Sequence, residues 1–150
     1  MIEDRENFLQ HCRKSIQKLM RKAAKENLIP VVRVNGTSDL PQLALALAAE
    51  FPEVQFYDYT KVPRPSTRVR SNYHLTFSLS ESNDREALDA LARGVNVAVA
   101  FQVKRGHALP VSYMGYKVID GALSALRFLD AKDDDGRASG YRRIEPAIAQ

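Results

Sequence analysis

The chain has 150 residues and a charged fraction of 27%, which is typical of one globular domain. Its formal net charge of +4 permits a nucleic-acid partner without requiring one. No apolar run approaches the roughly 18 residues of a membrane-spanning helix, and the acidic segment Met1–Asn7 lacks the apolar core of a secretion signal. Cys12 is the only cysteine, so a disulfide within the chain is excluded, and we expect a cytoplasmic protein without a membrane partner.

An amphipathic helix is predicted from about Ile2 to Glu26. One face repeats apolar side chains every three or four positions, which is the spacing of a helix that packs on a core. These apolar residues are Phe8, Leu9, Cys12, Ile16, Leu19, Met20 and Ala23. The opposite face is expected to carry Arg13, Lys14, Lys18, Arg21, Lys22 and Lys25. These cations either stay in solvent or bind phosphate groups or an acidic protein.

Two strand–helix–strand units follow the first helix. This pattern is typical of an α/β fold in which βα repeats form a mainly parallel sheet or a partial barrel. The expected strands are Val31–Val34, Val54–Lys61, Asn72–Leu79 and Val95–Val103, and the expected helices are Pro41–Phe51 and Asp84–Arg93. One or two further strands are expected within Leu109–Ile119.

Side-chain caps are expected where these two helices begin. Ser38 or Asp39 can cap the first helix, after Gly36, which permits a positive φ or a close backbone approach. Asn83 and Glu86 resemble a capping box at the second helix. The inward face of the second helix is expected to comprise Leu88, Leu91 and Ala92.

Polar side chains follow three of the predicted strands. The carboxyl ends of parallel strands meet at one edge of a sheet, and ligands bind there in α/β folds. Asp39, Asp58 and Glu81 are therefore the candidate catalytic residues, as metal ligands or as a general base. The candidate ligand-binding residues are Asn35, Ser38, Tyr57, Lys61, Arg64, Arg68, Ser78 and Asn83.

Asp58 also has a structural interpretation. Strand alternation points Phe56, Asp58 and Thr60 to one side of the sheet. A buried Asp58 needs a hydrogen-bond donor, which Arg33 or Lys61 could supply in a salt bridge. The alternatives for this residue are thus a ligand site and a structural ion pair.

The segment Val62–Ser71 is rich in proline and arginine and has no acidic residue. Its prolines, Pro63 and Pro65, exclude regular structure. Its positive charge comes from Arg64, Arg68 and Arg70, beside Lys61. It is either a solvated loop or an arm that binds phosphate or nucleic acid.

The domain is expected to span residues 1–130, with the helix at 1–28 packed on it. Residues 131–150 are expected to form a flexible tail, because the segment that follows Asp130 is rich in Asp, Gly and Ser. The three histidines do not have the spacing of a zinc site. The sequence leaves open whether the carboxylates of Asp39, Asp58 and Glu81 bind a divalent metal.

Five sequence blocks stand out: Val32–Asp39, Phe56–Lys61, Asn72–Asn83, Asn96–Phe101 and Gly115–Gly121. Together they resemble an uncharacterised α/β domain family that phages, plasmids and related mobile elements carry, over about Pro30–Asp130. The resemblance implies βα units with polar strand ends, and it implies no reaction.

Two departures from the family limit what the resemblance implies. The resemblance implies that relatives carry aspartates where this chain has Ala122 and Ala125. A metal site or charge network built on those aspartates would therefore be incomplete in this chain. More distant phage proteins with similar strand ends carry cysteine clusters, but Cys12 alone cannot hold an iron–sulfur cluster.

Two functions are consistent with these residues, and no complete catalytic motif decides whether the protein is an enzyme. The first is a strand-end pocket that binds a phosphate-bearing ligand, either a nucleotide or nucleic acid, with or without catalysis. The second is a non-enzymatic inhibitor of a host defence system, similar to anti-CRISPR proteins, that binds through a basic surface. The residues of that surface would be Lys14, Lys18, Arg21, Arg64, Arg68 and Arg70.

Overall fold

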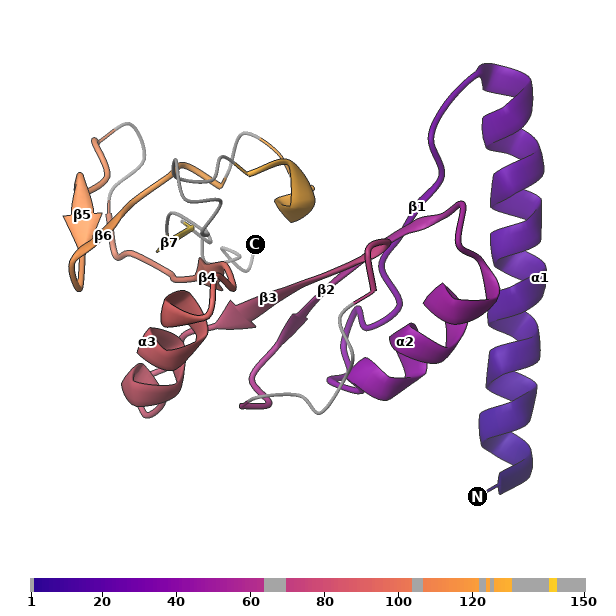
Figure 1. The fold of residues 1–150 in the computed structure, drawn as a ribbon, viewed down its shortest axis with the longest axis horizontal. Helices are drawn as coiled ribbons and strands as arrows, with labels where there is room; N and C mark the ends of the chain where they lie inside the picture. The colour runs from indigo at the N-terminus through magenta and orange to yellow at the C-terminus, as the bar shows by residue number, and fades with distance from the viewer. Residues whose placement is uncertain are drawn as a thin grey trace, which may run out of the picture. The chain divides into compact units, whose positions relative to one another are not determined.

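The computed structural model describes residues 2–63, 70–103, 107–121, 124, 126–130 and 141–142, with the backbone alone for residues 2, 3, 141 and 142. Its elements are α1 (Ile2–Glu26), β1 (Val31–Val32), α2 (Pro41–Glu50), β2 (Gln55–Thr60), β3 (Tyr73–Ser78), α3 (Asp84–Ala92), β4 (Val97–Ala98), β5 (Ser112–Tyr113), β6 (Tyr116–Lys117), the 3-10 helix η1 (Arg127–Leu129) and β7 (Tyr141–Arg142) (Figure 1). The predicted N-terminal helix and the mixed α/β fold are confirmed. No helix in the described part of the chain is both long enough and apolar enough to cross a membrane.

The main sheet is parallel wherever its pairing is described. Its strand order among the described residues is β1-β2-β3-β4-β7. β1 pairs with β2, β3 with β4 and β4 with β7, each time in parallel. Helix α2 connects β1 to β2 and helix α3 connects β3 to β4, as crossovers between parallel strands require. The predicted mainly parallel sheet is therefore confirmed.

The chain divides into two compact units, and each is described by itself. The first comprises Met1–Asp58 with Ser66–His74, and the second comprises Tyr59–Pro65 with Leu75–Gln150. Helices α1 and α2 belong to the first unit, whereas α3 and the β5–β6 hairpin belong to the second.

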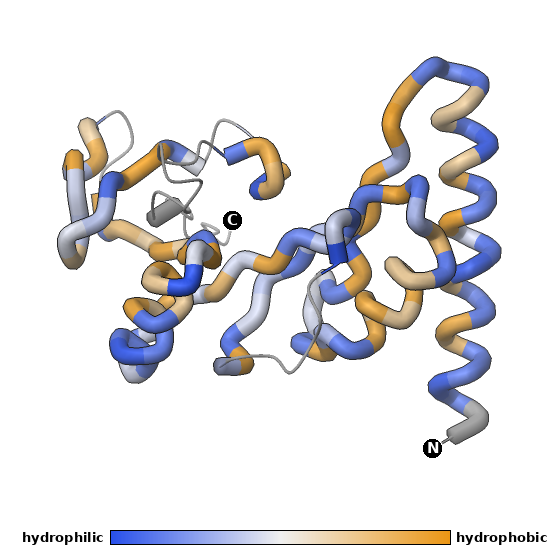
Figure 2. The backbone as a smooth tube through the Cα atoms, in the orientation of Figure 1, coloured by the Kyte–Doolittle hydropathy of each residue, from blue (hydrophilic) through white to orange (hydrophobic). Residues whose placement is uncertain are grey.

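In the first unit, α1 is held by a narrow stripe of buried side chains. Leu9, Ile16 and Ala23 are 7%, 4% and 5% exposed and stand seven residues apart. Seven residues are close to two helical turns, so these side chains lie on one face. Phe8, which was predicted on this face, is 47% exposed, so the buried stripe is narrower than expected. Figure 2 shows how hydrophobic and hydrophilic residues alternate along α1.

Arg13 joins α1 to the end of α2. Its Nε and Nη2 donate to the two carboxylate oxygens of Glu50 at 2.7 and 2.9 Å, and its Nη1 donates to Glu6 at 2.8 Å. These hydrogen bonds raise the pKa of Arg13 and lower the pKa of Glu50. The prediction that Arg13 belongs to the solvent-facing basic side of α1 is wrong, because its guanidinium faces α2.

Asn72 connects the end of α2 to the sheet. Its Nδ2 donates to the carbonyl oxygens of Ala48, Phe51 and Val54 at 3.0, 3.0 and 3.1 Å. Carbonyls at the carboxyl end of a helix lack intrahelical donors, so the side chain of Asn72 supplies the missing hydrogen-bond donor. The carbonyl oxygen of Asn72 also accepts from the backbone N–H of Phe56 at 2.7 Å.

In the second unit, α3 packs on β3 and β4 through small and apolar side chains. The buried core comprises Phe77, Ala87, Ala90, Leu91, Val97 and Val99. Leu91 is buried as predicted, but Leu88 is 37% exposed and Ala92 is also exposed. The predicted inward face was therefore wrong at these two positions, because alanines and not leucines approach the sheet.

The further strands that were predicted within Leu109–Ile119 are confirmed as β5 and β6. β5 and β6 pair in antiparallel fashion, and Met114 and Gly115 take φ values of 48° and 83° at the turn. Two successive residues with positive φ are typical of a type I′ turn. Within the predicted tail, Tyr141–Arg142 forms β7, and the rest of the tail lies outside the described residues.

Ile16→Ala is expected to destabilise the protein by about 2–4 kcal/mol, because it leaves a cavity in the narrow stripe that holds α1. The measurement is the free energy of unfolding from urea denaturation. Phe8→Ala on the same helix is the control and should cost less than about 1 kcal/mol, since half of its side chain is already in solvent. Equal losses for both variants would mean that the stripe does not hold α1.

Candidate functional site

Asp58 is the most deeply buried of the candidate carboxylates. Phe56, Asp58 and Thr60 are 0%, 1% and 3% exposed, whereas the residues between them on β2 are partly exposed. The prediction from strand alternation is therefore confirmed. A carboxylate in such a place requires hydrogen-bond donors, because burial penalises its charge.

Asn35 and Tyr73 supply those donors. The backbone N–H of Asn35 donates to Oδ1 of Asp58 at 2.9 Å, and its Nδ2 donates to Oδ2 at 2.9 Å. The hydroxyl of Tyr73 donates to Oδ2 at 3.3 Å. Of Arg33 and Lys61, which were predicted as donors in a salt bridge, Arg33 acts on Asp58 through its charge. We call Asn35, Asp58 and Tyr73 the Asp58 cluster.

The remaining atoms of Asn35 organise the loop before α2. Its Oδ1 accepts from the hydroxyl of Ser38 at 2.9 Å and from the backbone N–H of Leu40 at 3.3 Å. Its Nδ2 also lies 3.3 Å from the carbonyl oxygen of Leu40. Asn35 therefore ties the ends of β1 and β2 to the start of α2.

The predicted cap of α2 by Ser38 or Asp39 is wrong. The N-cap residue is Leu40, and no side chain makes a capping hydrogen bond there, because the hydroxyl of Ser38 is turned to Asn35. Gly36 has no positive φ, and a Cβ at this position would meet nothing within 4 Å. The loop conformation therefore comes from the hydrogen bonds of Asn35 and not from a glycine.

Electrostatics in the Asp58 cluster are dominated by burial. Burial raises the pKa of Asp58, and the hydrogen bonds from Asn35 and Tyr73 and the charge of Arg33 oppose this rise. Burial and the neighbouring Asp58 charge raise the pKa of Tyr73 far above its usual range. Tyr73 therefore keeps its proton and remains a donor to Asp58.

The predicted site residues at and after the end of β3 are Ser78, Glu81 and Asn83, and they lie in the second unit. Asn83 stabilises the turn between β3 and α3. Oδ1 of Asn83 accepts from the backbone N–H of Ser80 at 2.7 Å, and its Nδ2 donates to the carbonyl oxygen of Ser78 at 3.0 Å. Asn83 occupies the N-cap position of α3 but makes no side-chain capping bond, so the predicted capping box with Glu86 is wrong. Glu81 is exposed.

The other predicted site residues are partly or fully exposed, or lie outside the residues that the structure describes. Tyr57 is partly exposed, and Lys61 and Arg70 are exposed. Arg64 and Arg68 lie outside the described residues, as do Ala122 and Ala125. Across the described ranges, no three His, Cys, Asp or Glu side chains are grouped so that they could hold a metal ion.

Arg127 is a buried charge that the sequence reading missed. It is 2% exposed, and its Nη1 lies 3.1 Å from Oδ1 of Asp130. Its Nη2 donates to the carbonyl oxygens of Gly121 and Ser124, and Nδ2 of Asn96 donates to Asp130 at 3.4 Å. The only signal in the sequence was an arginine inside the apolar segment Leu126–Leu129, which does not identify its partners.

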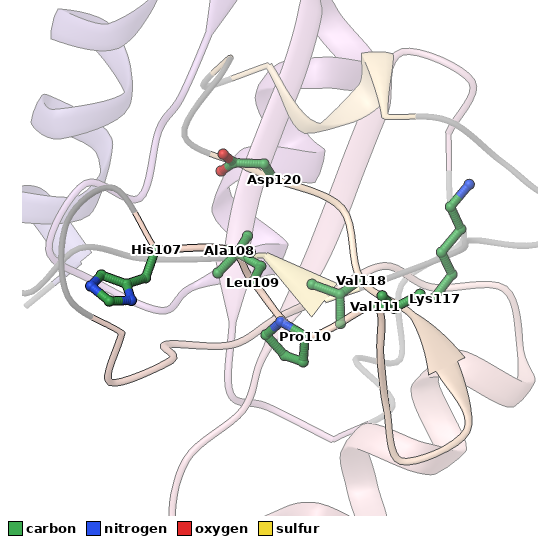
Figure 3. Close-up of a pocket in the computed structure, with 8 residues that line it drawn as sticks. All are labelled: His107, Ala108, Leu109, Pro110, Val111, Lys117, Val118 and Asp120. Carbon is green, nitrogen blue, oxygen red and sulfur yellow. The ribbon is translucent and has the colours of Figure 1, made fainter.

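A cavity of about 390 Å³ lies beside the β5–β6 hairpin (Figure 3). Its walls are mainly apolar, with one imidazole, one ammonium and one carboxylate group. The lining residues are His107, Ala108, Leu109, Pro110, Val111, Lys117, Val118 and Asp120. None of them was among the predicted site residues.

The exposed side of α1 carries a row of cations. Lys14, Lys18, Arg21 and Lys25 follow one another at intervals of four, three and four residues, and all four are exposed. At 100° per residue they fall within an arc of about 60°, centred about 170° from the buried stripe. We call these four residues the basic row. Within the described residues none of the four forms an ion pair, whereas Lys22 lies 3.9 Å from Glu26.

Asp58→Asn is expected to lower stability at pH 7 by about 1–3 kcal/mol, because its new amide N–H₂ group faces a donor and leaves it unpaired. The pKa of Asp58 is raised in the folded state, so its contribution is fully present below the unfolded pKa and is lost as the pH rises through the folded pKa. The difference in unfolding free energy between wild type and variant should therefore be larger at pH 4 than at pH 7.

Urea denaturation at several pH values measures this difference. Glu53→Gln removes an exposed carboxylate in the same unit and serves as the control, for which a nearly constant difference is expected. A difference that grows with pH for Asp58→Asn would contradict the assigned cause.

A family model described as Gene product 88 matches residues 1–145. No curated protein and no solved structure matched the chain. The match includes α1, which lies outside the segment that carried the sequence resemblance, and it confirms the phage-borne family. The chain belongs to the Gene product 88 family, a phage-type gene product family.

Proposed function

We propose that this protein binds nucleic acid through the basic row of α1. The observation that carries the proposal is the arrangement of Lys14, Lys18, Arg21 and Lys25 along one exposed helix face, directly opposite the stripe that attaches the helix. Phosphate groups are the complementary partner of such a row, because Lys and Arg contacts to phosphates supply most of the affinity in sequence-independent binding.

The charge balance of α1 supports this proposal. Between Asn7 and Lys25 the helix has six Lys and Arg residues and no Asp or Glu. Arg13 is neutralised by Glu50 and Glu6, and Lys22 has Glu26 nearby. The basic row is thus the part of this charge that remains available to a partner.

The strand ends of the first unit support a different role. Both oxygens of Asp58 accept hydrogen bonds from within the chain, and both polar atoms of the Asn35 side chain have partners. We infer that the Asp58 cluster positions the loop before α2 and that a phosphate-bearing ligand contacts α1 instead. The cytoplasm, which the single cysteine favours, is where we place this binding.

The variant Lys14→Gln/Lys18→Gln/Arg21→Gln is expected to weaken binding to a 20-base-pair DNA duplex by at least about tenfold, because it removes three of the four phosphate contacts. Fluorescence anisotropy at 50 mM salt is the measurement, and a wild-type Kd of about 10⁻⁴–10⁻⁶ M or tighter is expected. The control Arg5→Gln/Arg85→Gln/Arg93→Gln removes the same net charge at exposed positions outside the row and should change Kd less than threefold.

Two further measurements separate the alternatives. Tyr73→Phe alters the Asp58 cluster and should leave Kd unchanged; a large loss would favour the strand-end site. Poly-glutamate at equal total charge should compete poorly with the duplex, whose phosphates are more densely charged. Equally strong competition would favour an acidic protein partner, as for an inhibitor of a host defence system, and would contradict nucleic-acid binding as the function.

A further inference from the structure

We propose that the partner of the basic row is a double-helical nucleic acid, which α1 contacts at about four phosphates of one strand without reading the base sequence. This inference rests on the proposed function and makes its ligand specific. It follows from the spacing of the cations along the helix, from the residues beside them and from the lack of an aromatic stacking surface in the row.

The four cations form a single ridge along the helix axis. They do not form two rows on either side of a central face. With a rise of 1.5 Å per residue, they are spaced about 6, 4.5 and 6 Å along the helix axis and span about 16.5 Å. This spacing is of the same order as that between neighbouring phosphates of one strand. Lys and Arg can also bind guanine edges in the major groove, but a helix that reads sequence combines them with further base-reading side chains, whereas the ridge consists of four cations in succession.

No acidic residue lies beside the ridge between Lys14 and Lys25. Ser15 and Lys22 lie on one side of it, and Gln17 and Ala24 lie on the other. With such neighbours α1 can approach a sugar–phosphate backbone closely. The row is held straight, because α1 is continuous from Ile2 to Glu26 and is anchored along its length at Leu9, Ile16 and Ala23.

Single-stranded nucleic acid is a poorer match. Proteins that prefer single strands stack the bases on aromatic side chains. Phe8 is the only Phe, Tyr or Trp in α1, and it lies about 110° around the helix from the centre of the row. The row therefore offers charge without a stacking surface, which favours the higher charge density of a duplex.

The test is the salt dependence of Kd between 50 and 200 mM NaCl, on two unrelated 20-base-pair DNA duplexes, an RNA duplex and a 20-nucleotide single strand. Four phosphate contacts predict a slope of log K against log[salt] of about −3.6 on a duplex, equivalent to a loss of about 150-fold in affinity over this range. The two DNA sequences should agree within about threefold. The single strand should bind more weakly than either duplex.

The variant Lys14→Gln/Lys18→Gln/Arg21→Gln should reduce the slope to about −0.9, since one contact remains. The control Arg5→Gln/Arg85→Gln/Arg93→Gln should retain the wild-type slope, which excludes a general effect of net charge. A preference between the DNA and the RNA duplex supports the proposal and identifies the natural ligand.

Three results would overturn the inference while leaving nucleic-acid binding intact: tighter binding to the single strand, a preference between the two DNA sequences of about 10³-fold, or a slope that the row variant does not change. Absence of binding to all four probes would instead overturn the proposed function itself. The two failures are therefore distinguishable in one set of titrations.

Discussion

A buried carboxylate sets the local structure of the first unit. Asp58 lies near the end of β2 with 1% exposure, and a charge in that place is tolerated only when donors surround it. Asn35 meets this need with both its backbone and its side chain, and in doing so it brings the end of β1 next to the end of β2. The remaining side-chain oxygen of Asn35 then organises the entry to α2.

Helix α1 depends on that arrangement through α2. Its attachment uses a thin apolar stripe and one charged contact, from Arg13 to Glu50 at the last residue of α2. Such a narrow attachment leaves most of the helix surface in solvent. The consequence for function is that four cations share one uninterrupted face, and this face is the strongest candidate binding surface that we find in the first unit.

The candidate site was only partly predictable from sequence. Strand alternation correctly predicted that Asp58 shares one side of β2 with Phe56 and Thr60, because side-chain direction in a strand follows from local geometry. Its partner Tyr73 could not be predicted, because the two residues meet only when β2 and β3 are brought together. Ser38 and Asn83 are good capping residues by type, yet each makes a different bond, because nearby polar groups compete for the same atoms.

Local chemistry in the sequence by itself determined the helices, the order of strands and helices and the parallel pairing, since hydrophobic periodicity and crossover length act over short distances. The basic character of α1 was also determined at this level. Tertiary contacts decided which cations remain available: packing turned Arg13 to Glu50 and left Lys14, Lys18, Arg21 and Lys25 exposed on the face opposite the buried stripe. Long-range contacts also decided the partners of the buried Asp58, because Asn35 is 23 residues away in the sequence.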